Sequence, residues 1–96
     1  MSLRDDIHRQ RAAILEIAAR HGASNVGLFG SVVRGEERPD SDIDLLVDLA
    51  PDRGFGEFLA MAEELEVLLG HRVEIVTRRG LSPYFRPYIE AEVRPI

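Results

Sequence analysis

The stretch Phe29–Asp48, FGSVVRGEERPDSDIDLLVD, decides the fold and carries a charge pattern that needs a cause. The alternation over residues 42–49 predicts a β-strand, on which Asp42 and Asp44 share one face. The apolar run of residues 45–47 is typical of a strand that is buried on both faces. Neighbouring carboxylates in such a strand repel each other and lose hydration, so the pattern indicates a bound cation.

Amphipathic helices are predicted on both sides of this stretch. Over residues 3–21 apolar side chains recur on one face, Ser2 and Asp5 form a capping box, and Gly22 suits a left-handed helix end. A second helix is expected over residues 55–69, where a glycine again follows the last apolar residue. The strand is therefore expected to pack against helices.

The remaining elements are short. Strands are predicted over residues 25–29 and 72–77. A helix of about two turns is predicted over residues 31–37, closing near Gly35. A short or kinked helix is expected after Ser82 and Pro83, followed by an extended end, VRPI. Together they predict one domain over residues 1–96 of the α/β (α+β) class, with a small mixed β-sheet and helices packed against it.

Composition excludes several classes of protein. The chain has 96 residues, of which 45% are hydrophobic and 30% charged, a balance that disordered chains lack. Its formal net charge of -5 disfavours general attraction to nucleic acid or to anionic membranes, so no direct nucleic-acid binding is expected. It has no cysteine and no apolar run long enough for a signal peptide or a membrane span, so a cytoplasmic location is expected.

Magnesium is the natural candidate for the cation beside Asp42 and Asp44. Mg²⁺ prefers oxygen ligands and usually takes one or two protein carboxylates, completing its octahedron with water and substrate phosphates. Glu74 interrupts the predicted strand over residues 72–77 and would add a third carboxylate. These three acidic residues would complete a two-metal site of the kind that transfers phosphoryl groups.

A phosphate-binding turn is predicted just before the acidic strand. Gly30 lets the backbone approach a ligand closely, and the hydroxyl of Ser31 adds a hydrogen-bond donor. Arg34, one helical turn later, could reach either a phosphate or one of the site carboxylates. The combination indicates a nucleoside triphosphate held between this turn and bound metal.

The order and spacing of these residues resemble a known family. GS at residues 30–31, RG at 34–35 and SDIDL at 41–45 are similar to the signature of the minimal nucleotidyltransferase (MNT) family, within the DNA polymerase beta-like nucleotidyltransferase superfamily. The resemblance implies that superfamily's fold, Mg²⁺, and ATP or another nucleoside triphosphate as the donor of a nucleotidyl group to a hydroxyl.

The resemblance also implies roles and a partner. Gly30 and Ser31 would hold the triphosphate, and Asp42 and Asp44 would bind metal. Members commonly act as the antitoxin of a HEPN-domain ribonuclease toxin by adding AMP to a toxin tyrosine, which implies a hetero-oligomer. The third acidic position is usually aspartate in these proteins, whereas this chain has Glu74.

Other interpretations stay open at this point. One alternative is a non-catalytic module that neutralises its partner by masking it. Another is a small-molecule nucleotidyltransferase. An alternative role for Asp42 and Asp44 is to keep an exposed edge strand from aggregating. Glu74 would then be an ordinary solvent-facing residue, and Arg34 would be part of a structural ion pair.

Two further groups of side chains are expected to be structural. Tyr84, Phe85 and Tyr88 have helical spacing, which predicts packing in the core or at an interface. The three histidines have no metal-ligand spacing, so positions at the surface or at helix ends are expected for them.

Overall fold

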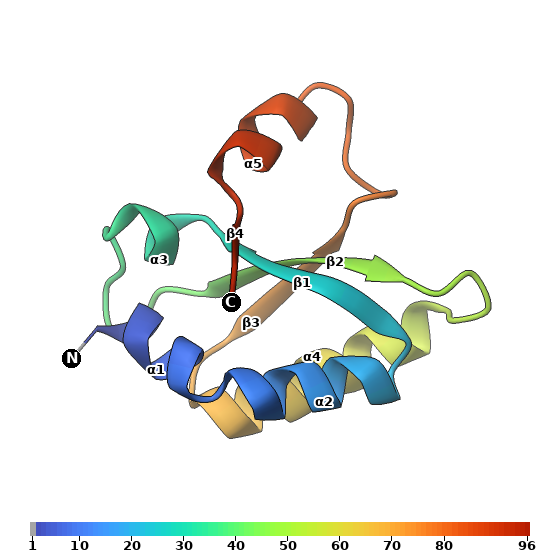
Figure 1. Cartoon of the computed structure of the whole chain (residues 1–96), viewed down its shortest axis with the longest axis horizontal. Helices are drawn as coiled ribbons and strands as arrows, with labels where there is room; N and C mark the ends of the chain where they lie inside the picture. The colour runs from blue at the N-terminus through green and yellow to red at the C-terminus, as the bar shows by residue number, and fades with distance from the viewer. Residues whose placement is uncertain (1) are drawn as a thin grey trace.

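Four β-strands form one mixed sheet in the order β3-β2-β1-β4, in which β2 runs parallel to β3 and antiparallel to β1. The computed structural model describes residues 2–96. Its elements are α1 (Leu3–Arg9), α2 (Arg11–Arg20), β1 (Ala23–Phe29), α3 (Ser31–Arg34), β2 (Ile43–Leu49), α4 (Phe55–Leu69), β3 (Val73–Thr77), α5 (Arg86–Glu92) and β4 (Arg94–Pro95). The expected mixed sheet with helices packed against it is confirmed (Figure 1).

The main core lies between the sheet and three helices. Figure 1 shows α1, α2 and α4 together on one side of the sheet, and α5 on the other side. Ile43, Leu45 and Val47 of β2 join the buried residues of these helices in one cluster. Leu46, which points to the opposite face, is 0% exposed. The prediction that β2 is buried on both faces is therefore confirmed.

Helix ends follow the predicted capping chemistry. Ser2 and Asp5 form the expected capping box at the start of α1. Gly22 has φ +78°, and Gly70 adopts the left-handed conformation after α4, so the chain leaves each helix in a conformation that glycine tolerates best. The predicted bounds of α4 agree with the structure.

The single helix predicted over residues 3–21 is wrong in one respect, because it is broken at Gln10 into α1 and α2. Gln10 has φ -96° and ψ 14°, which leaves the regular helix. Ile7 before the break and Ile14 after it are both fully buried. Periodicity predicts these buried faces well. It does not reveal a bend between two helical segments when both segments keep the same face toward the core.

The tail differs more from expectation. Ser82 caps a turn by accepting a hydrogen bond from the Tyr84 N–H, and α5 begins only at Arg86, with Pro87 in its first turn. The extended end is confirmed as β4, which pairs with β1. Because proline is tolerated in the first turn of a helix, Pro87 is compatible with a helix that starts at Arg86. The helix therefore starts later than Ser82 and Pro83 predict.

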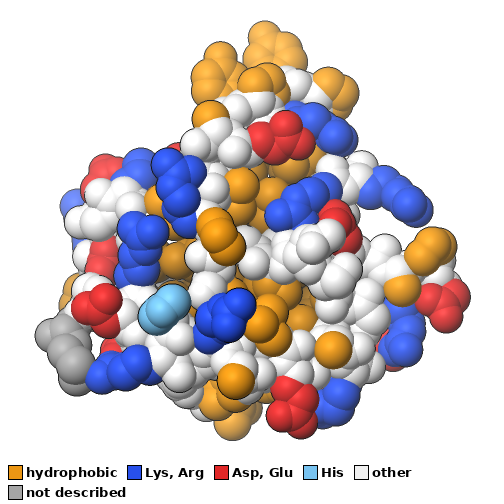
Figure 2. Space-filling view, in the orientation of Figure 1, with side chains coloured by type: hydrophobic (Ala, Val, Ile, Leu, Met, Phe, Trp, Pro, Cys, Tyr) orange, Lys and Arg blue, Asp and Glu red, His pale blue; other side chains and the backbone are white. Residues whose placement is uncertain are grey.

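The aromatic side chains of the tail do not pack in the core. Tyr84, Phe85 and Tyr88 are 82%, 61% and 73% exposed. Two of them precede α5, so the three do not form one face of that helix. Packing in the core is therefore wrong for them, and packing at an interface stays a prediction. Figure 2 shows hydrophobic side chains gathered over α5 at the top of the view.

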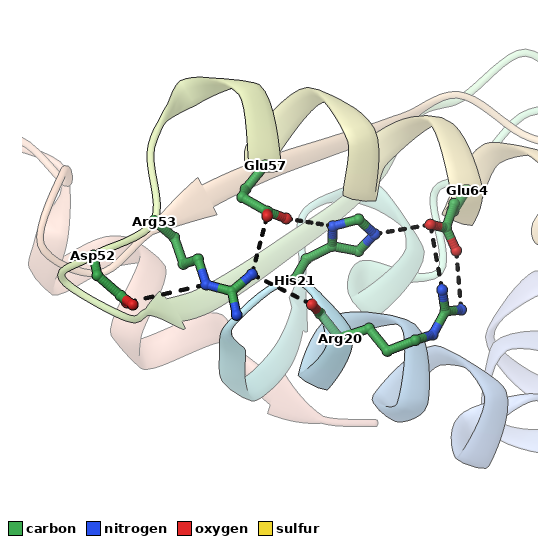
Figure 3. A network of polar contacts seen from close by, with 6 residues as sticks. All are labelled: Arg20, His21, Asp52, Arg53, Glu57 and Glu64. Atoms are coloured by element: carbon green, nitrogen blue, oxygen red, sulfur yellow. Dashed lines mark hydrogen bonds and ion pairs between the residues drawn. The ribbon is translucent and has the colours of Figure 1, made fainter.

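A network of charged side chains joins the end of α2 to α4 (Figure 3). His21 lies at its centre with a side chain only 13% exposed, between Glu57 at 2.6 Å from Nδ1 and Glu64 at 2.8 Å from Nε2. Arg53 pairs with Glu57 and Arg20 with Glu64. His21 stands at a helix end, as expected, but it also ties two helices together.

We expect His21→Gln to lower the melting temperature by a few degrees, and most strongly between about pH 4.5 and pH 6.5. Hydrogen bonds to Glu64 and Glu57 raise the pKa of His21, so its contribution is complete below 6.5 and is lost as the pH rises through the folded-state pKa. His21 lowers the pKa values of both glutamates, whose contribution is present above 4.5 and is lost as the pH falls.

The measurement is thermal unfolding of both proteins from pH 4 to pH 9. The exposed His8 offers a matched control, because His8→Gln removes an imidazole from the surface of α1. A difference between wild type and His21→Gln that stays constant across this range would contradict the linkage.

Among residues 2–96, no helix combines the length and the apolar character needed to cross a membrane. The cytoplasmic location stays a prediction.

Candidate active site

The predicted acidic residues lie on two neighbouring strands. Asp44 of β2 is the register partner of Glu74 on β3, and Asp42 comes directly before β2. Asp42 and Asp44 are half-buried, whereas Glu74 is exposed. Because β2 lies between β1 and β3, the edge-strand interpretation is wrong for the two aspartates; β3 is an edge strand, so a solvent-facing role remains open for Glu74.

These carboxylates interact unfavourably with one another. Burial, together with the charge and hydrogen bonding of Glu74 and the charge of Asp42, raises the pKa of Asp44 to about 6. The guanidinium of Arg34 acts in the opposite direction but does not cancel these effects. The folded chain thus gathers negative charge around Asp44 that its own cations leave largely uncompensated.

The phosphate-binding turn predicted at Gly30 lies directly against this carboxylate. Phe29 is the register partner of Asp44, which brings the end of β1 beside the acidic strand. A Cβ placed on Gly30 would lie 2.1 Å from Asp44 Oδ2, so a side chain there would displace this carboxylate or the turn. Gly30 also has φ 83° and ψ -154°, a conformation that is essentially restricted to glycine.

Two carboxylates that were not predicted as site residues bind Arg34. Its Nε donates to Glu36 at 2.7 Å, and its Nη1 donates to both oxygens of Glu92 at 2.9 Å. The same Glu92 accepts a hydrogen bond from the Gly30 N–H at 2.5 Å. Glu92 therefore joins the candidate site from α5, and nothing in the local sequence of the tail marks it.

Asp42 and Glu74 also share a surface hollow on the α4 side of β3. Half of its lining residues are acidic, and the lining consists of Asp42, Leu59, Ala62, Glu63, Glu66, Arg72, Val73 and Glu74. The two outer acidic residues of the candidate site thus border space that a second molecule can enter.

The donor set suits a hard divalent cation. Carboxylate oxygens are the ligands that Mg²⁺ prefers, and a cation here would relieve the repulsion that raises the pKa of Asp44. Within residues 2–96, no three histidine, aspartate or glutamate side chains converge into a ready-made metal site. A metal ion here would take part of its coordination from water or from substrate, as Mg²⁺ commonly does with phosphates.

Comparisons with known proteins agree with this chemistry. The family model described as a nucleotidyltransferase domain matches residues 11–96. Protein adenylyltransferase MntA of Thermococcus cleftensis is 44% identical over 67 residues, which are 70% of this chain and 68% of the relative. The candidate protein adenylyltransferase MJ1379 of Methanocaldococcus jannaschii is 33% identical over 91 residues, 92% of this chain and 89% of the relative.

Solved structures share the fold. A protein described as a candidate minimal nucleotidyltransferase is 45% identical and superposes with a TM-score of 0.87, covering 100% of this chain and 97% of the other. A toxin-antitoxin structure solved with AMP-PNP is 22% identical, with a TM-score of 0.75 over 88% of this chain and 69% of the other. The second likeness is one of fold alone.

Proposed function

Because the chain belongs to the nucleotidyltransferase domain family, we propose that it is a Mg²⁺-dependent protein adenylyltransferase that transfers AMP from ATP to a hydroxyl of a partner protein. One observation carries the proposal: the Gly30 turn packs directly on Asp44, which in turn pairs with Glu74. Donors for phosphate oxygens and ligands for a metal ion therefore meet within one small region, as transfer from a nucleoside triphosphate requires.

The adenylyl group and the protein acceptor are supported by the relatives. One curated relative, at 44% identity, carries the name protein adenylyltransferase, and a second, at 33% identity, is named a candidate protein adenylyltransferase. A neighbour of the same fold was solved as a toxin-antitoxin with AMP-PNP, an analogue of ATP. These names support a toxin as the partner and this chain as its antitoxin. The resemblance of residues 30–45 to the minimal nucleotidyltransferase signature supports the finer proposal, a HEPN-domain ribonuclease toxin with a tyrosine as the acceptor.

The residues divide into two groups in the proposed reaction. Asp42, Asp44 and Glu74 would hold Mg²⁺, which when bound neutralises charge on the triphosphate and on the leaving group. The Gly30 N–H and the Ser31 hydroxyl would orient the phosphates by donating hydrogen bonds. Positioning and charge compensation therefore supply most of the catalysis, as they do in phosphoryl transfer generally.

The exposed position of Glu74 suits it for accepting the proton of the acceptor hydroxyl. As the acceptor oxygen bonds to the α-phosphorus, the bond from that phosphorus to the bridging oxygen breaks and pyrophosphate leaves. The acceptor hydroxyl loses its proton in this step, and Glu74, which is exposed, would take it. Glu74 would then act both as a metal ligand and beside the acceptor.

The decisive test is the intact mass of the protein encoded beside this chain, measured after incubation with this chain, ATP and Mg²⁺. The expected result is a gain of one or more AMP units, with the modified side chain located by peptide mass spectrometry. An unchanged mass in a complex that still forms would contradict transfer and would favour masking. The exposed aromatic residues around α5 are the observation that keeps masking as the second candidate.

Metal removal gives a prediction of its own. We expect EDTA to lower the rate of AMP transfer by at least about a hundredfold, because the negative charge around Asp44 then repels the triphosphate. Excess Mg²⁺ should restore the rate. The measurement is transfer of labelled AMP with and without chelator, and transfer that persists in EDTA would exclude the metal-dependent mechanism.

A further inference from the structure

Glu92 occupies two hydrogen-bond donors at the Gly30 turn, the Gly30 N–H and the Arg34 guanidinium. Its Oε1 accepts the Gly30 N–H at 2.5 Å, and both of its oxygens lie 2.9 Å from Arg34 Nη1. The Glu92 side chain is 26% exposed, so the contact is partly shielded from water. A carboxylate from the tail thus stands where an anionic ligand of the turn would stand.

A carboxylate and a phosphate use these donors in the same way. Both are anions that accept charge-assisted hydrogen bonds from a guanidinium and from backbone N–H groups. A backbone N–H has one hydrogen and serves one acceptor well, so Gly30 cannot donate fully to Glu92 and to a phosphate together. The two anions also repel each other at such short range.

We propose that Glu92 is a built-in competitor of the nucleotide, and that nucleotide binding displaces it and loosens α5. This inference rests on the proposed function, because it takes the Gly30 turn as the place where the triphosphate binds. In the nucleotide-free protein Glu92 holds Arg34 and the turn in place. Nucleotide binding would exchange one anion for another at the same donors.

The way α5 is attached makes it responsive to this exchange. None of its residues is buried. Besides Glu92, its attachments include a hydrogen bond from Arg86 to the Arg78 carbonyl, the β4 pairs Gly27 with Pro95 and Leu28 with Arg94, and the buried Ile96 after β4. A short helix without a buried face gains little stability from packing. The contacts of Glu92 therefore matter for where α5 sits, and their loss should be visible along the helix.

The first test is ATP affinity by calorimetry in Mg²⁺ buffer. Removing the competitor should tighten binding about threefold to tenfold in Glu92→Ala, because a partly exposed, charge-assisted contact no longer has to be broken. Glu92→Gln keeps an acceptor without the charge and should fall between wild type and Glu92→Ala. Glu90→Ala and Glu90→Gln, at an exposed position of the same helix, control for net charge and for helix effects.

The second test follows hydrogen exchange of residues 86–92. Saturating ATP should speed exchange in the wild type, and Glu92→Ala should exchange quickly even without ATP. Slower exchange with ATP, or ATP affinity in Glu92→Ala equal to or weaker than in Glu90→Ala, overturns the proposal while the transferase assignment stands. If neither the wild type nor any variant binds ATP, the proposed function fails and the inference fails with it.

Discussion

Asp44→Asn is expected to lower the rate of AMP transfer about a thousandfold and, in metal-free buffer at pH 7.5, to raise the melting temperature by a few degrees. The loss of activity follows if Asp44 is a metal ligand. The gain in stability follows from its pKa, which burial and Glu74 raise to about 6. An ionised Asp44 is less favourable in the folded protein than in the unfolded chain.

The stabilisation has a defined pH dependence. The favourable contribution of protonated Asp44 is complete below its ordinary value of 3.8 and is lost as the pH rises through about 6. The melting temperatures of wild type and Asp44→Asn should therefore converge as the pH falls toward 4. Added Mg²⁺ should reduce the difference at pH 7.5, because a bound cation stabilises the ionised form of the wild type.

Asp48 of the same strand supplies the matched control. Hydrogen bonds from Asn25 and Arg78 lower its pKa, so Asp48→Asn should destabilise the protein above pH 3.8 and leave AMP transfer close to wild type. Thermal unfolding and a transfer assay on both variants check the two signs. Retained activity in Asp44→Asn, or lower stability for both variants, would refute the assignment of Asp44.

Gly30→Ala should have the second largest effect. We expect a loss of about 3 kcal/mol in the free energy of unfolding and about a hundredfold in transfer rate. The backbone at Gly30 has φ 83° and ψ -154°, and the added methyl carbon would lie 2.1 Å from Asp44 Oδ2. The variant must therefore move either the turn or the side chain of Asp44, and both belong to the proposed site.

Gly35 provides a comparison at a glycine that lacks the contact with Asp44. It has the left-handed conformation, with φ 71° and ψ 24°, which other residues tolerate better than the conformation of Gly30, and a Cβ there meets nothing within 4 Å. Gly35→Ala should cost only about 1 kcal/mol and leave transfer nearly unchanged. Chemical denaturation and transfer rates of both variants provide the measurement. Equal losses of activity would show that contact with Asp44 is not what Gly30 provides.

The parts of the fold that depend on local pattern could be predicted from the sequence. The bounds of α4 agree because its apolar period and terminal glycine both act within a few residues. Alternation predicted that Asp42, which directly precedes β2, and Asp44 within β2 share a face, and the glycine-serine turn at the end of β1 followed from the same stretch. A single stretch, Phe29–Asp48, thus contains most of the candidate site.

What could not be predicted depends on contacts between distant residues. Glu92 reaches the Gly30 turn only because β4 pairs with β1 and brings the tail across the sheet. In the sequence, His21 looks like an ordinary residue at a helix end, because its contacts with Glu57 and Glu64 of α4 form only in the folded protein. Patterns of period 2 or 3.6 report which face is buried, but not which charged partner comes from another element.

The order of the strands has a consequence for the size of the acceptor. Glu74 stands on β3, and within residues 2–96 no further strand lies beyond it. The acidic pair formed with Asp44 therefore sits at the margin of the sheet rather than at the bottom of an enclosed cleft. A deep cleft admits small molecules and excludes side chains that remain attached to a folded body. A marginal position lets a side chain approach laterally while the rest of its protein stays outside.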